Sequence, residues 1–588
     1  MRSCISTTAV VLAVALAAAV APPAIAAAPA KAPAATKGAT TATTQPAAAR
    51  KPAARKPPLS TPGLETIIQD DGILLHRPPA EVEAAVLRMK QLGADRVRIT
   101  ASWSSLTRAP EGEAKPEGFD AADPAAYEQS RWTMLDSAIR AIRGAGLKAL
   151  VDIGFWAPHW ATDDPPGPRA RSNIDPQAYA DFATAVALRY SGGFTVPAEP
   201  ASTPPPPPSE DASLIADLLG PILPFPLPAP FPPRSAPRAA PTGAAAGPSE
   251  PLPSVDRFIL WNEPNHQGLL LPQWKADGTT PASPGVYRAM VRAGYAAVKA
   301  VRRNATVLIG NTSSTGGARG RGPVAPLEFL RELACVDALM QPRTTDDCAG
   351  FTTLPGDGWA HHPYSQNERP ERVSKPKTEP GDLRIADTPV LAKTLDALVR
   401  MGRLAPANRD IHLTEFGYET KGIPGRPRVD ERQQARWMTW AEQIADSVPR
   451  VRAFAQFLLR DQPPAPERVS QSAARPFGEY STGLLNIDGS DKVISKSFLA
   501  GLFVQLQPKG QVLVYGRLRL GAGPKVIVLQ RRTKGRAWTT IERMRIDGRH
   551  AFQRTLKHRP GTVYRLTYPT AAGPRTTSMP LAPVPAYR

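Results

Sequence analysis

Two glutamates stand directly after short apolar runs, where the ends of strands could present them for chemistry. Glu263 follows Phe258–Asn262, and Glu415 follows Ile411–Thr414. Two carboxyl groups in different surroundings can divide proton transfer and nucleophilic attack between them, which is what cleavage of a glycosidic bond requires. A single carboxylate at a strand end can equally pair with an arginine or cap the next helix, so the pair means more than either residue alone.

Because positions 263 and 415 are far apart in the chain, the fold must bring them together. Between residues 61 and 504, short apolar runs alternate with amphipathic stretches of helical period, which is typical of repeated β-α units. Helices are expected at Pro79–Leu92 and Trp132–Ala145, each with a glycine close to its end. Eight strands are expected, at Thr66–Ile68, Arg96–Thr100, Ala149–Ile153, Arg257–Trp261, Thr306–Ile309, Gly358–His361, Ile411–Thr414 and Ala453–Phe457.

Eight strands that alternate with helices favour a closed barrel over a doubly wound sheet. We therefore predict an α/β chain with a (β/α)8 TIM barrel, followed by a small all-β sandwich. Barrel enzymes carry their chemistry at the carboxyl ends of the strands. Glu263 would end the fourth strand and Glu415 the seventh, so that the two face each other across the mouth of the barrel.

The segment Asn262-Glu263-Pro264 after the fourth strand, together with Glu415 after the seventh, resembles clan A of the retaining glycoside hydrolases. The resemblance covers about residues 61–504 and is similar to the cellulase-like enzymes of families 5 and 39. It implies hydrolysis of O-glycosidic bonds by double displacement, without a metal or another cofactor. In that mechanism Glu263 is the acid/base and Glu415 the nucleophile. The charge of ionised Glu415 is expected to hold Glu263 protonated until a glycosyl-enzyme forms.

Four further residues fit a sugar site of this kind. Asn262 can donate to the 2-hydroxyl of a sugar. Arg98 resembles the arginine that keeps the nucleophile of these enzymes ionised. His362-Pro363-Tyr364 resembles the His-x-Tyr pair of family 5, in which the tyrosine hydroxyl bonds the nucleophile, although a packing role in a loop is the alternative for both residues.

Aromatic side chains cluster just past the expected strand ends, where their faces could stack on sugar rings. Any single tryptophan can equally fill the core. The segment Phe155–Ala161 resembles the third-strand segment of family 39, and its His159 could reach a hydroxyl. Many clan A enzymes carry a tryptophan at the end of the eighth strand; here Gln456 or Arg460 could take its place. The predicted contacts are Trp103, Trp156, His159, Trp160 and Tyr418, with Trp359 and Phe416 in the same group.

The first 60 residues predict export. Residues 1–26 read as a signal peptide, with a basic start at Arg2, an apolar run over Ala9–Val20 and a small-x-small cleavage site at 24–26. A retained membrane anchor is the weaker alternative, because the apolar run is shorter than a bilayer span. We expect a secreted protein, either free or held at the cell surface, with no membrane span after cleavage. Residues 27–60 form a disordered spacer rich in alanine, proline and lysine.

Two more segments depart from the barrel pattern. Residues 196–254 are a proline-rich insertion in the catalytic domain. Residues 505–588 have short alternating runs separated by glycine turns and no helical period, which predicts a β-sandwich. The second segment is basic and resembles the immunoglobulin-like modules of many secreted bacterial enzymes.

The net charge of +20 is carried by the two ends of the chain. Residues 1–60 contribute +7 and residues 505–588 contribute +15, which leaves −2 for residues 61–504. This distribution argues against nucleic acid as a partner, since no basic groove is expected in the barrel. The basic ends could instead adhere to an anionic cell-wall polymer. We expect a monomer that acts on an oligo- or polysaccharide; the alternative is a catalytically silent barrel that binds carbohydrate or the cell wall.

The three cysteines fit an exported protein. Cys4 lies in the expected signal peptide, which leaves Cys335 and Cys348 to form one disulfide, with two buried thiols as the alternative. No nearby histidine or cysteine completes a zinc site with this pair. The glycine-rich segment Gly310–Gly317 lacks the lysine of a phosphate-binding loop.

Overall fold

The structure is a computed structural model that describes residues 61–107, 114–165, 169–197, 250–420, 428–463, 480–570 and 573–585. The expected signal peptide, the spacer and all but the two ends of the proline-rich insertion lie outside the described residues.

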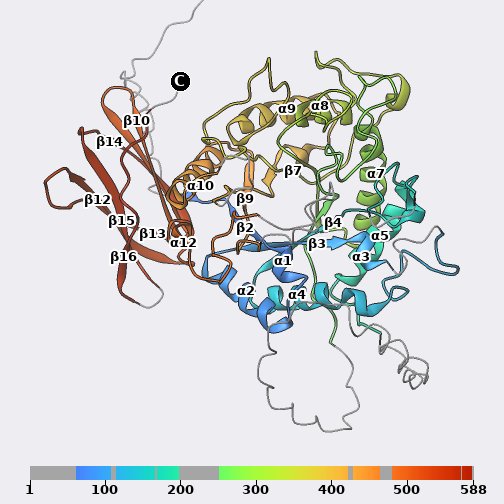
Figure 1. The fold of residues 1–588 in the computed structure, drawn as a ribbon, viewed down its shortest axis with the longest axis horizontal. Coiled ribbons are helices and arrows are strands. Elements are labelled where there is room, and N and C mark those ends of the chain that lie inside the picture. The colour runs from blue at the N-terminus through green and yellow to red at the C-terminus, as the bar shows by residue number, and fades with distance from the viewer. Residues whose placement is uncertain are drawn as a thin grey trace, which may run out of the picture. The chain divides into compact units, whose positions relative to one another are not determined.

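Eight parallel strands close into a barrel in sequence order, with the last strand pairing with the first (Figure 1). The eight strands expected from the sequence are all confirmed, and the predicted fold class is confirmed with them. The bounds are β2 Glu65–Gln69, β3 Arg96–Ser102, β4 Lys148–Gly154, β5 Arg257–Leu260, β6 Thr306–Thr312, β7 Trp359–His361, β8 Ile411–Leu413 and β9 Val451–Phe457.

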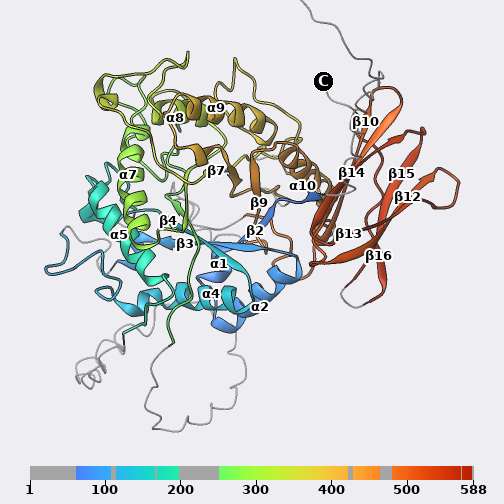
Figure 2. The ribbon, with the colours of Figure 1, turned by 180° about the vertical axis from the view of Figure 1, so that it is seen from behind.

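Helices surround the barrel, and both of the expected helices are present (Figures 1 and 2). The first of them begins with Pro79, whose fixed φ suits a first helical position, and is followed by Gly93 at φ 83°. The helices are α1 Asp71–Leu74, α2 Pro79–Gln91, α3 Trp103–Leu106, α4 Thr133–Gly144, α5 Pro176–Arg189, α7 Ser283–Val301, α8 Pro326–Leu333, α9 Thr388–Arg400, α10 Glu431–Asp446 and α12 Val493–Leu499.

The barrel has an inner and an outer core. Inward-facing side chains from six strands fill the barrel axis as one small cluster, which includes Ile67, Leu150, Ile259 and Leu308. A larger cluster lies between the strands and the helices. Since the axis is filled by side chains, the chemistry must take place at an end of the barrel and not inside it.

The C-terminal part is a sandwich of two antiparallel sheets. One sheet has the order β1-β14-β11-β10 and the other β13-β12-β15-β16. Strand β10 of the first sheet begins at Ala500, directly after helix α12, and so includes residues before 505. The strands are β1 Thr61–Pro62, β10 Ala500–Gln507, β11 Gln511–Leu518, β12 Pro524–Thr533, β13 Thr539–Asp547, β14 His550–Lys557, β15 Thr562–Pro569 and β16 Arg575–Thr577.

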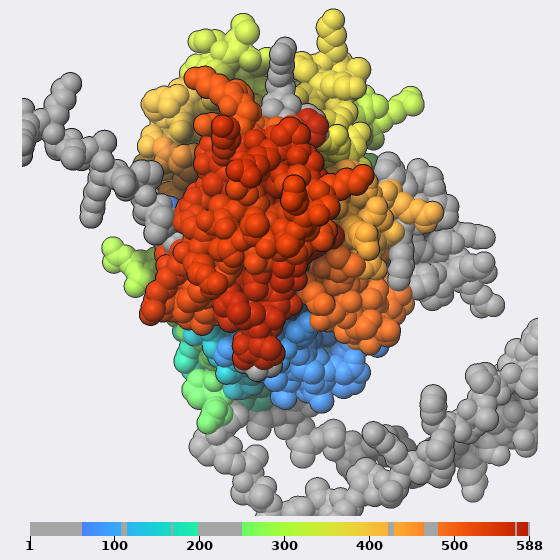
Figure 3. All heavy atoms as spheres, turned by 90° about the vertical axis from the view of Figure 1, so that its left-hand side faces the viewer, coloured from blue at the N-terminus to red at the C-terminus, as the bar shows by residue number. Residues whose placement is uncertain are grey.

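The sandwich packs on helix α10, and Figure 3 views the molecule from the sandwich side. The rings of Trp440 and Phe503 stack with their centroids 5.1 Å apart. Arg517 and Arg519, both buried, form salt bridges with Glu442 of α10. Apolar contact and buried ion pairs thus join the barrel and the sandwich.

The disulfide and the two ends of the insertion are also defined. Cys335 and Cys348 form the expected disulfide. The two described ends of the insertion lie together, because Leu252 N donates to Phe194 O and Val255 N donates to Tyr190 O. Within the described residues, no helix combines the length and the apolar character needed to cross a bilayer.

Candidate active site

Glu263 is held at the carboxyl end of β5 in an unusual backbone conformation. Trp261, Glu263 and Asn311 all have positive φ, at 67°, 41° and 47°. Such conformations cost about 1–3 kcal/mol each for residues other than glycine, and they cluster at functional sites. Glu263 N donates to Asn311 O at 3.0 Å, which ties the end of β5 to the end of β6.

The fold brings both predicted catalytic glutamates and His362 together. One carboxylate oxygen of Glu263, one of Glu415 and Nδ1 of His362 lie within 4.8 Å of one another. His362 Nδ1 lies 2.9 Å from Glu263 Oε1 and 3.5 Å from Glu415 Oε2. The side chains of Glu263 and Glu415 are 19% and 12% exposed, so solvent reaches both carboxylates.

Glu415 is surrounded by donors. Arg98 Nη1 forms a salt bridge with Oε1 of Glu415, and Tyr364 Oη donates to Oε2 at 3.1 Å. Burial, together with the charges of Glu415 and Glu263, raises the pKa of Tyr364 well above its usual value. Tyr364 is therefore a neutral phenol that donates its proton to Glu415.

Arg98 is itself fixed by three further residues. Its Nη1 donates to Gln69 Oε1 at 2.6 Å, and its Nη2 donates to Asp152 Oδ2 at 2.5 Å and to Asn262 Oδ1 at 2.8 Å. Arg98 is 1% exposed. The guanidinium thus links the first four strands of the barrel to the nucleophile candidate, and its rigid fork suits this role better than a lysine would.

The amide of Asn311 determines how His362 shares its protons. Asn311 Nδ2 donates to Trp261 O at 3.1 Å and to Asn262 Oδ1 at 3.0 Å, so Oδ1 is the atom that faces His362 Nε2 at 2.9 Å. Nε2 must therefore carry a proton. The contact between His362 Nδ1 and Glu263 Oε1 then requires one more proton, carried by either the imidazole or the carboxyl group.

The pKa of Glu263 depends on His362 as well as on burial. Burial raises the pKa of Glu263, but the hydrogen bond and charge of His362, with smaller effects from His266 and Arg98, outweigh burial and lower it below the usual value. The sequence indicated the charge of Glu415 but not the position of His362. The hydrogen bond from His362 therefore stabilises the ionised form of the Glu263 carboxyl group.

Asp152 was not predicted as a site residue. It is fully buried in β4, where it accepts from Arg98 and lies 3.5 Å from Asn311 Nδ2. Its other oxygen, Oδ1, is buried and has no partner among the described residues. The sequence could have indicated this residue, because Asp152 places a carboxylate inside the apolar run Ala149–Ile153. Ionised groups are rarely buried unless they are paired.

Replacing Asp152 with asparagine is expected to remove a pH dependence of stability. Burial is the main influence on Asp152, and it raises the pKa of this carboxyl group to about 6, well above its usual value, in spite of Arg98. Between about pH 4 and pH 6 the folded protein therefore binds more protons than the unfolded chain, and the contribution of Asp152 to the free energy of unfolding falls as pH rises, by about 1.4 kcal/mol per unit.

Urea unfolding of the wild type and Asp152→Asn at pH 4, 5, 6 and 7 measures this effect. The stability of the wild type relative to the variant should fall across pH 4–6 and level off above it. A constant difference between the two proteins would contradict the prediction.

The cluster of Glu263, His362 and Glu415 has donors that a divalent cation could also use. However, His362 Nδ1 is already hydrogen-bonded to Glu263, and Arg98 already supplies a positive charge to Glu415. This arrangement favours metal-free chemistry. Activity is expected to be unchanged after dialysis against EDTA. Loss of activity that zinc or magnesium restores would identify the cluster as a metal site instead.

Two of the predicted sugar-binding aromatics are core residues, so those predictions are wrong. Trp103 is completely buried and stacks on Phe182 with ring centroids 5.4 Å apart. Tyr418 is also completely buried and packs against Phe416 and Trp437. Trp359 and Phe416, from the same group, are buried too. Aromatic residues at strand ends here anchor the loops to the barrel wall.

His159 and Trp160 also have local packing roles. His159 Nε2 bonds to Asp164 O of its own loop, and its Nδ1 is buried. The ring of Trp160 packs edge-on against Trp103, and Lys115 lies over it at 5.6 Å. Both side chains are partly exposed, and no contact among the described residues links either ring to the glutamates. They remain predicted sugar contacts.

Trp156 remains a predicted sugar contact. It follows β4 with φ 54°, is half-buried, and donates from Nε1 to Gly268 O at 3.1 Å. Gly268 belongs to the loop that follows Glu263. Trp156 therefore lies against the loop of the acid/base candidate.

The end of the eighth barrel strand carries an aromatic pair that was not predicted. Phe457 is partly exposed and lies edge-on to Tyr364, with ring centroids 6.3 Å apart. Tyr480, 37% exposed, lies 5.5 Å from Phe457. Gln456 is buried and donates to Thr482 O, so it does not take the place of the missing tryptophan. Phe457 is the better candidate, since its ring is beside the tyrosine that bonds Glu415.

No protein-family model and no curated protein matches this sequence. Solved structures that resemble the chain include the exo-β-1,4-mannosidase Op5Man5 from Opitutaceae bacterium strain TAV5, at 13% identity and TM-score 0.39, covering 75% of this chain and 60% of that one. The chain therefore spans less than two thirds of the mannosidase chain.

Two others are a GH5_18 protein from Bifidobacterium longum subsp. infantis, at 15% identity and TM-score 0.40, and one from Streptomyces cattleya in complex with GlcNAc, at 15% and 0.39. They cover 74% and 75% of this chain, and 78% and 79% of their own chains. At these levels the function has to be inferred from the site itself.

Proposed function

We propose that this protein is a secreted retaining glycoside hydrolase that cleaves O-glycosidic bonds of an oligo- or polysaccharide by double displacement. The observation that carries the proposal is the pair of carboxylates at the carboxyl end of the barrel, with oxygens from each inside the 4.8 Å cluster. Retaining enzymes separate their carboxyl groups by about 5–5.5 Å, whereas inverting enzymes need about 6.5–9.5 Å to admit a water. The short separation favours retention.

The two carboxyl groups have the surroundings that the two roles need. Glu415, paired with Arg98 and bonded by Tyr364, is the group kept ionised, and it attacks the anomeric carbon. Glu263 transfers its proton to the departing oxygen as that bond breaks, which leaves a covalent glycosyl-enzyme. Glu263, now ionised, then takes a proton from a water that attacks the anomeric carbon and releases Glu415.

His362 shares a proton with Glu263, the group proposed to protonate the departing oxygen. One proton is shared between its Nδ1 and Glu263 Oε1, and Asn311 holds the other ring nitrogen in its donor form. A sugar that enters the site excludes water from Glu263 and favours the neutral carboxyl group, so the proton moves to Glu263. Asn262 has its Oδ1 occupied by Arg98 and Asn311, so its Nδ2 is the atom that can donate to the sugar 2-hydroxyl.

The N-terminal segment and the disulfide support an extracellular role. The proposed signal peptide at residues 1–26 would direct export, and a disulfide persists in an oxidising compartment. The basic ends would hold the enzyme near anionic wall polymers through attraction that salt weakens. Trp156 and Phe457 are the proposed stacking surfaces for the sugar, and the protein is proposed to act as a monomer.

The test is hydrolysis of a panel of polysaccharides and aryl glycosides, followed by measurement of reducing ends. NMR of the first product formed reports the configuration at the anomeric carbon. Retention supports the proposal, and inversion contradicts the double displacement. If the wild type releases no more sugar than Glu415→Gln on any substrate but still binds one of them, the alternative of a silent carbohydrate-binding barrel holds.

A further inference from the structure

The end of the barrel opposite the catalytic glutamates also carries a cavity. The amino ends of strands β2, β5, β8 and β9 face the sandwich there, and the cavity between them has a volume of about 1160 Å³. Its walls come from the barrel floor, from helices α2 and α12, and from strands β11, β12 and β16 of the sandwich. The cavity is therefore built by both parts of the chain, and it shares no residue with the catalytic cluster.

The charge of this cavity is strongly positive. Ten basic side chains and three acidic ones line it. Some of the basic groups are neutralised, because Arg257 is paired with Glu65, and Arg517 and Arg519 are paired with Glu442. Lys148, Lys496 and Lys525 have no salt bridge or side-chain hydrogen bond to any described residue. Three unpaired ammonium groups around one cavity leave an excess of positive charge for a ligand to balance.

Buried polar atoms at the cavity wall also lack partners. His412 is 5% exposed, and its Nδ1 is buried without a hydrogen bond among the described residues. Nε of Arg257 is also buried without a hydrogen bond among the described residues. An unsatisfied buried polar atom costs about 1–3 kcal/mol and calls for an explanation. Both residues line the cavity.

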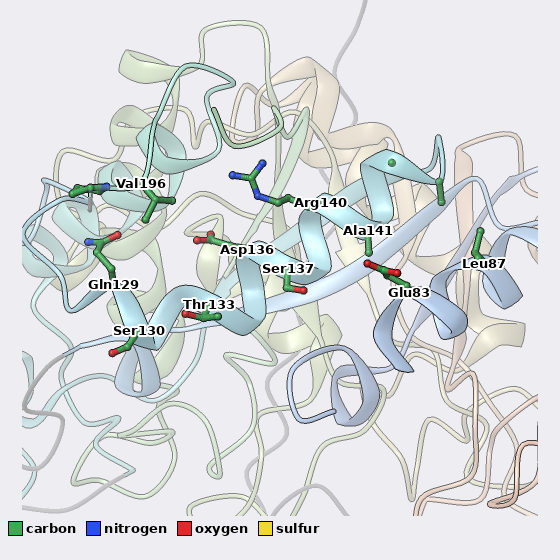
Figure 4. Close-up of a pocket in the computed structure, with 13 residues that line it drawn as sticks. Glu83, Leu87, Gln129, Ser130, Thr133, Asp136, Ser137, Arg140, Ala141 and Val196 are labelled. Carbon is green, nitrogen blue, oxygen red and sulfur yellow. The ribbon is translucent and has the colours of Figure 1, made fainter. Parts of the chain in front are cut away.

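A second groove among the described residues is different in this respect. It has a volume of about 810 Å³ and runs along α4 (Figure 4). Its Asp136 and Gln129 already accept from Arg189, and its Arg140 donates to Glu250 O. Since these polar groups are satisfied within the chain, that groove gives no reason to expect a charged ligand.

We propose that the cavity between the barrel floor and the sandwich binds a segment of an anionic polymer, one that carries phosphate or carboxylate groups along its length. Ligand pockets for small molecules occupy about 300–1000 Å³, so this volume suits several linked units better than one small ion. Arginine and lysine are the side chains that recognise phosphate and carboxylate oxygens. The site would keep the enzyme attached to such a polymer while the opposite end of the barrel stays open for hydrolysis, and it does not depend on the proposed hydrolase activity.

The test compares two triple variants of the full chain that lose the same charge. One carries Lys148→Gln, Lys496→Gln and Lys525→Gln in the cavity. The control carries Lys534→Gln, Arg543→Gln and Arg545→Gln, three exposed positions of the sandwich outside the cavity. Binding of fluorescent inorganic polyphosphate and of polygalacturonate is measured by anisotropy at several salt concentrations. The first probe reports phosphate recognition and the second carboxylate recognition.

The cavity variant should bind at least one probe about tenfold more weakly or worse, while the control loses less than about threefold. Equal losses in the two variants, or no binding by the wild type, would overturn the proposal, since attraction would then follow net charge alone. Hydrolysis of an uncharged substrate should be the same in all three proteins. An inactive wild type would refute the proposed hydrolysis and leave the binding result standing.

Discussion

Replacement of Glu415 by glycine is expected to abolish hydrolysis, with kcat reduced by about 10⁴-fold or more. The variant has no group that can attack the anomeric carbon, so the glycosyl-enzyme cannot form. The loss should be the same for substrates with good and with poor leaving groups, because the missing step is attack. Arg98 keeps its bonds to Asp152 and Gln69, so the site should remain folded.

Azide gives this variant a specific control. The small anion can occupy the space left by the Glu415 carboxylate and attack in its place, in one displacement. An activated aryl glycoside should therefore yield a glycosyl azide of inverted configuration, detected by NMR. Glu415→Gln, which fills that space, should show no rescue. An azide product of retained configuration would assign Glu415 another role.

The barrel could be predicted from the sequence because each strand is an apolar run followed by an amphipathic helix. Five site residues could be predicted from the sequence for a related reason: Glu263, Glu415, Arg98, His362 and Tyr364. Each lies in or directly after one of these runs, and closure of a parallel barrel brings such positions to one end. The order of the strands around the barrel was therefore enough to predict which residues come together in the catalytic cluster.

The burial of individual side chains could not be predicted from the sequence in the same way. Trp103 and Phe457 both lie at strand ends, yet the first is buried against Phe182 and the second is partly exposed beside Tyr364. Nothing in the residue type separates the two cases, because stacking on a sugar and packing in a core use the same apolar surface. Asp152 differs, since its carboxylate in an apolar strand could have indicated a buried ion pair.

The proton shared by Glu263 and His362 shows why the local network matters for mechanism. The expected proximity of the two carboxylates across the barrel mouth indicates that their charges repel, which favours a proton on one of them. The structure adds a third group whose other nitrogen is fixed as a donor by Asn311. Three residues from three strands determine this arrangement together, and no pairwise pattern along the chain encodes it.

Replacement of Glu263 by alanine is expected to change the dependence of rate on the leaving group. General acid catalysis contributes about 10²–10⁴-fold, so hydrolysis of an oligosaccharide should fall by that factor. A dinitrophenyl glycoside needs no proton for departure, and its first step should stay close to the wild-type rate. The second step lacks its base and slows, so a burst of phenol should appear as the glycosyl-enzyme accumulates.

Azide distinguishes this variant from the nucleophile variant. With Glu415 intact, azide attacks the glycosyl-enzyme in a second displacement, so the glycosyl azide should have retained configuration and turnover should rise. The matched control is His362→Gln, which leaves Glu263 in place but removes the shared proton, and which should lower oligosaccharide hydrolysis without an azide effect. If Glu263→Ala lost the same factor on both substrates and gave no burst, Glu263 would not be the proton donor, and the division of roles between the two carboxylates would fail.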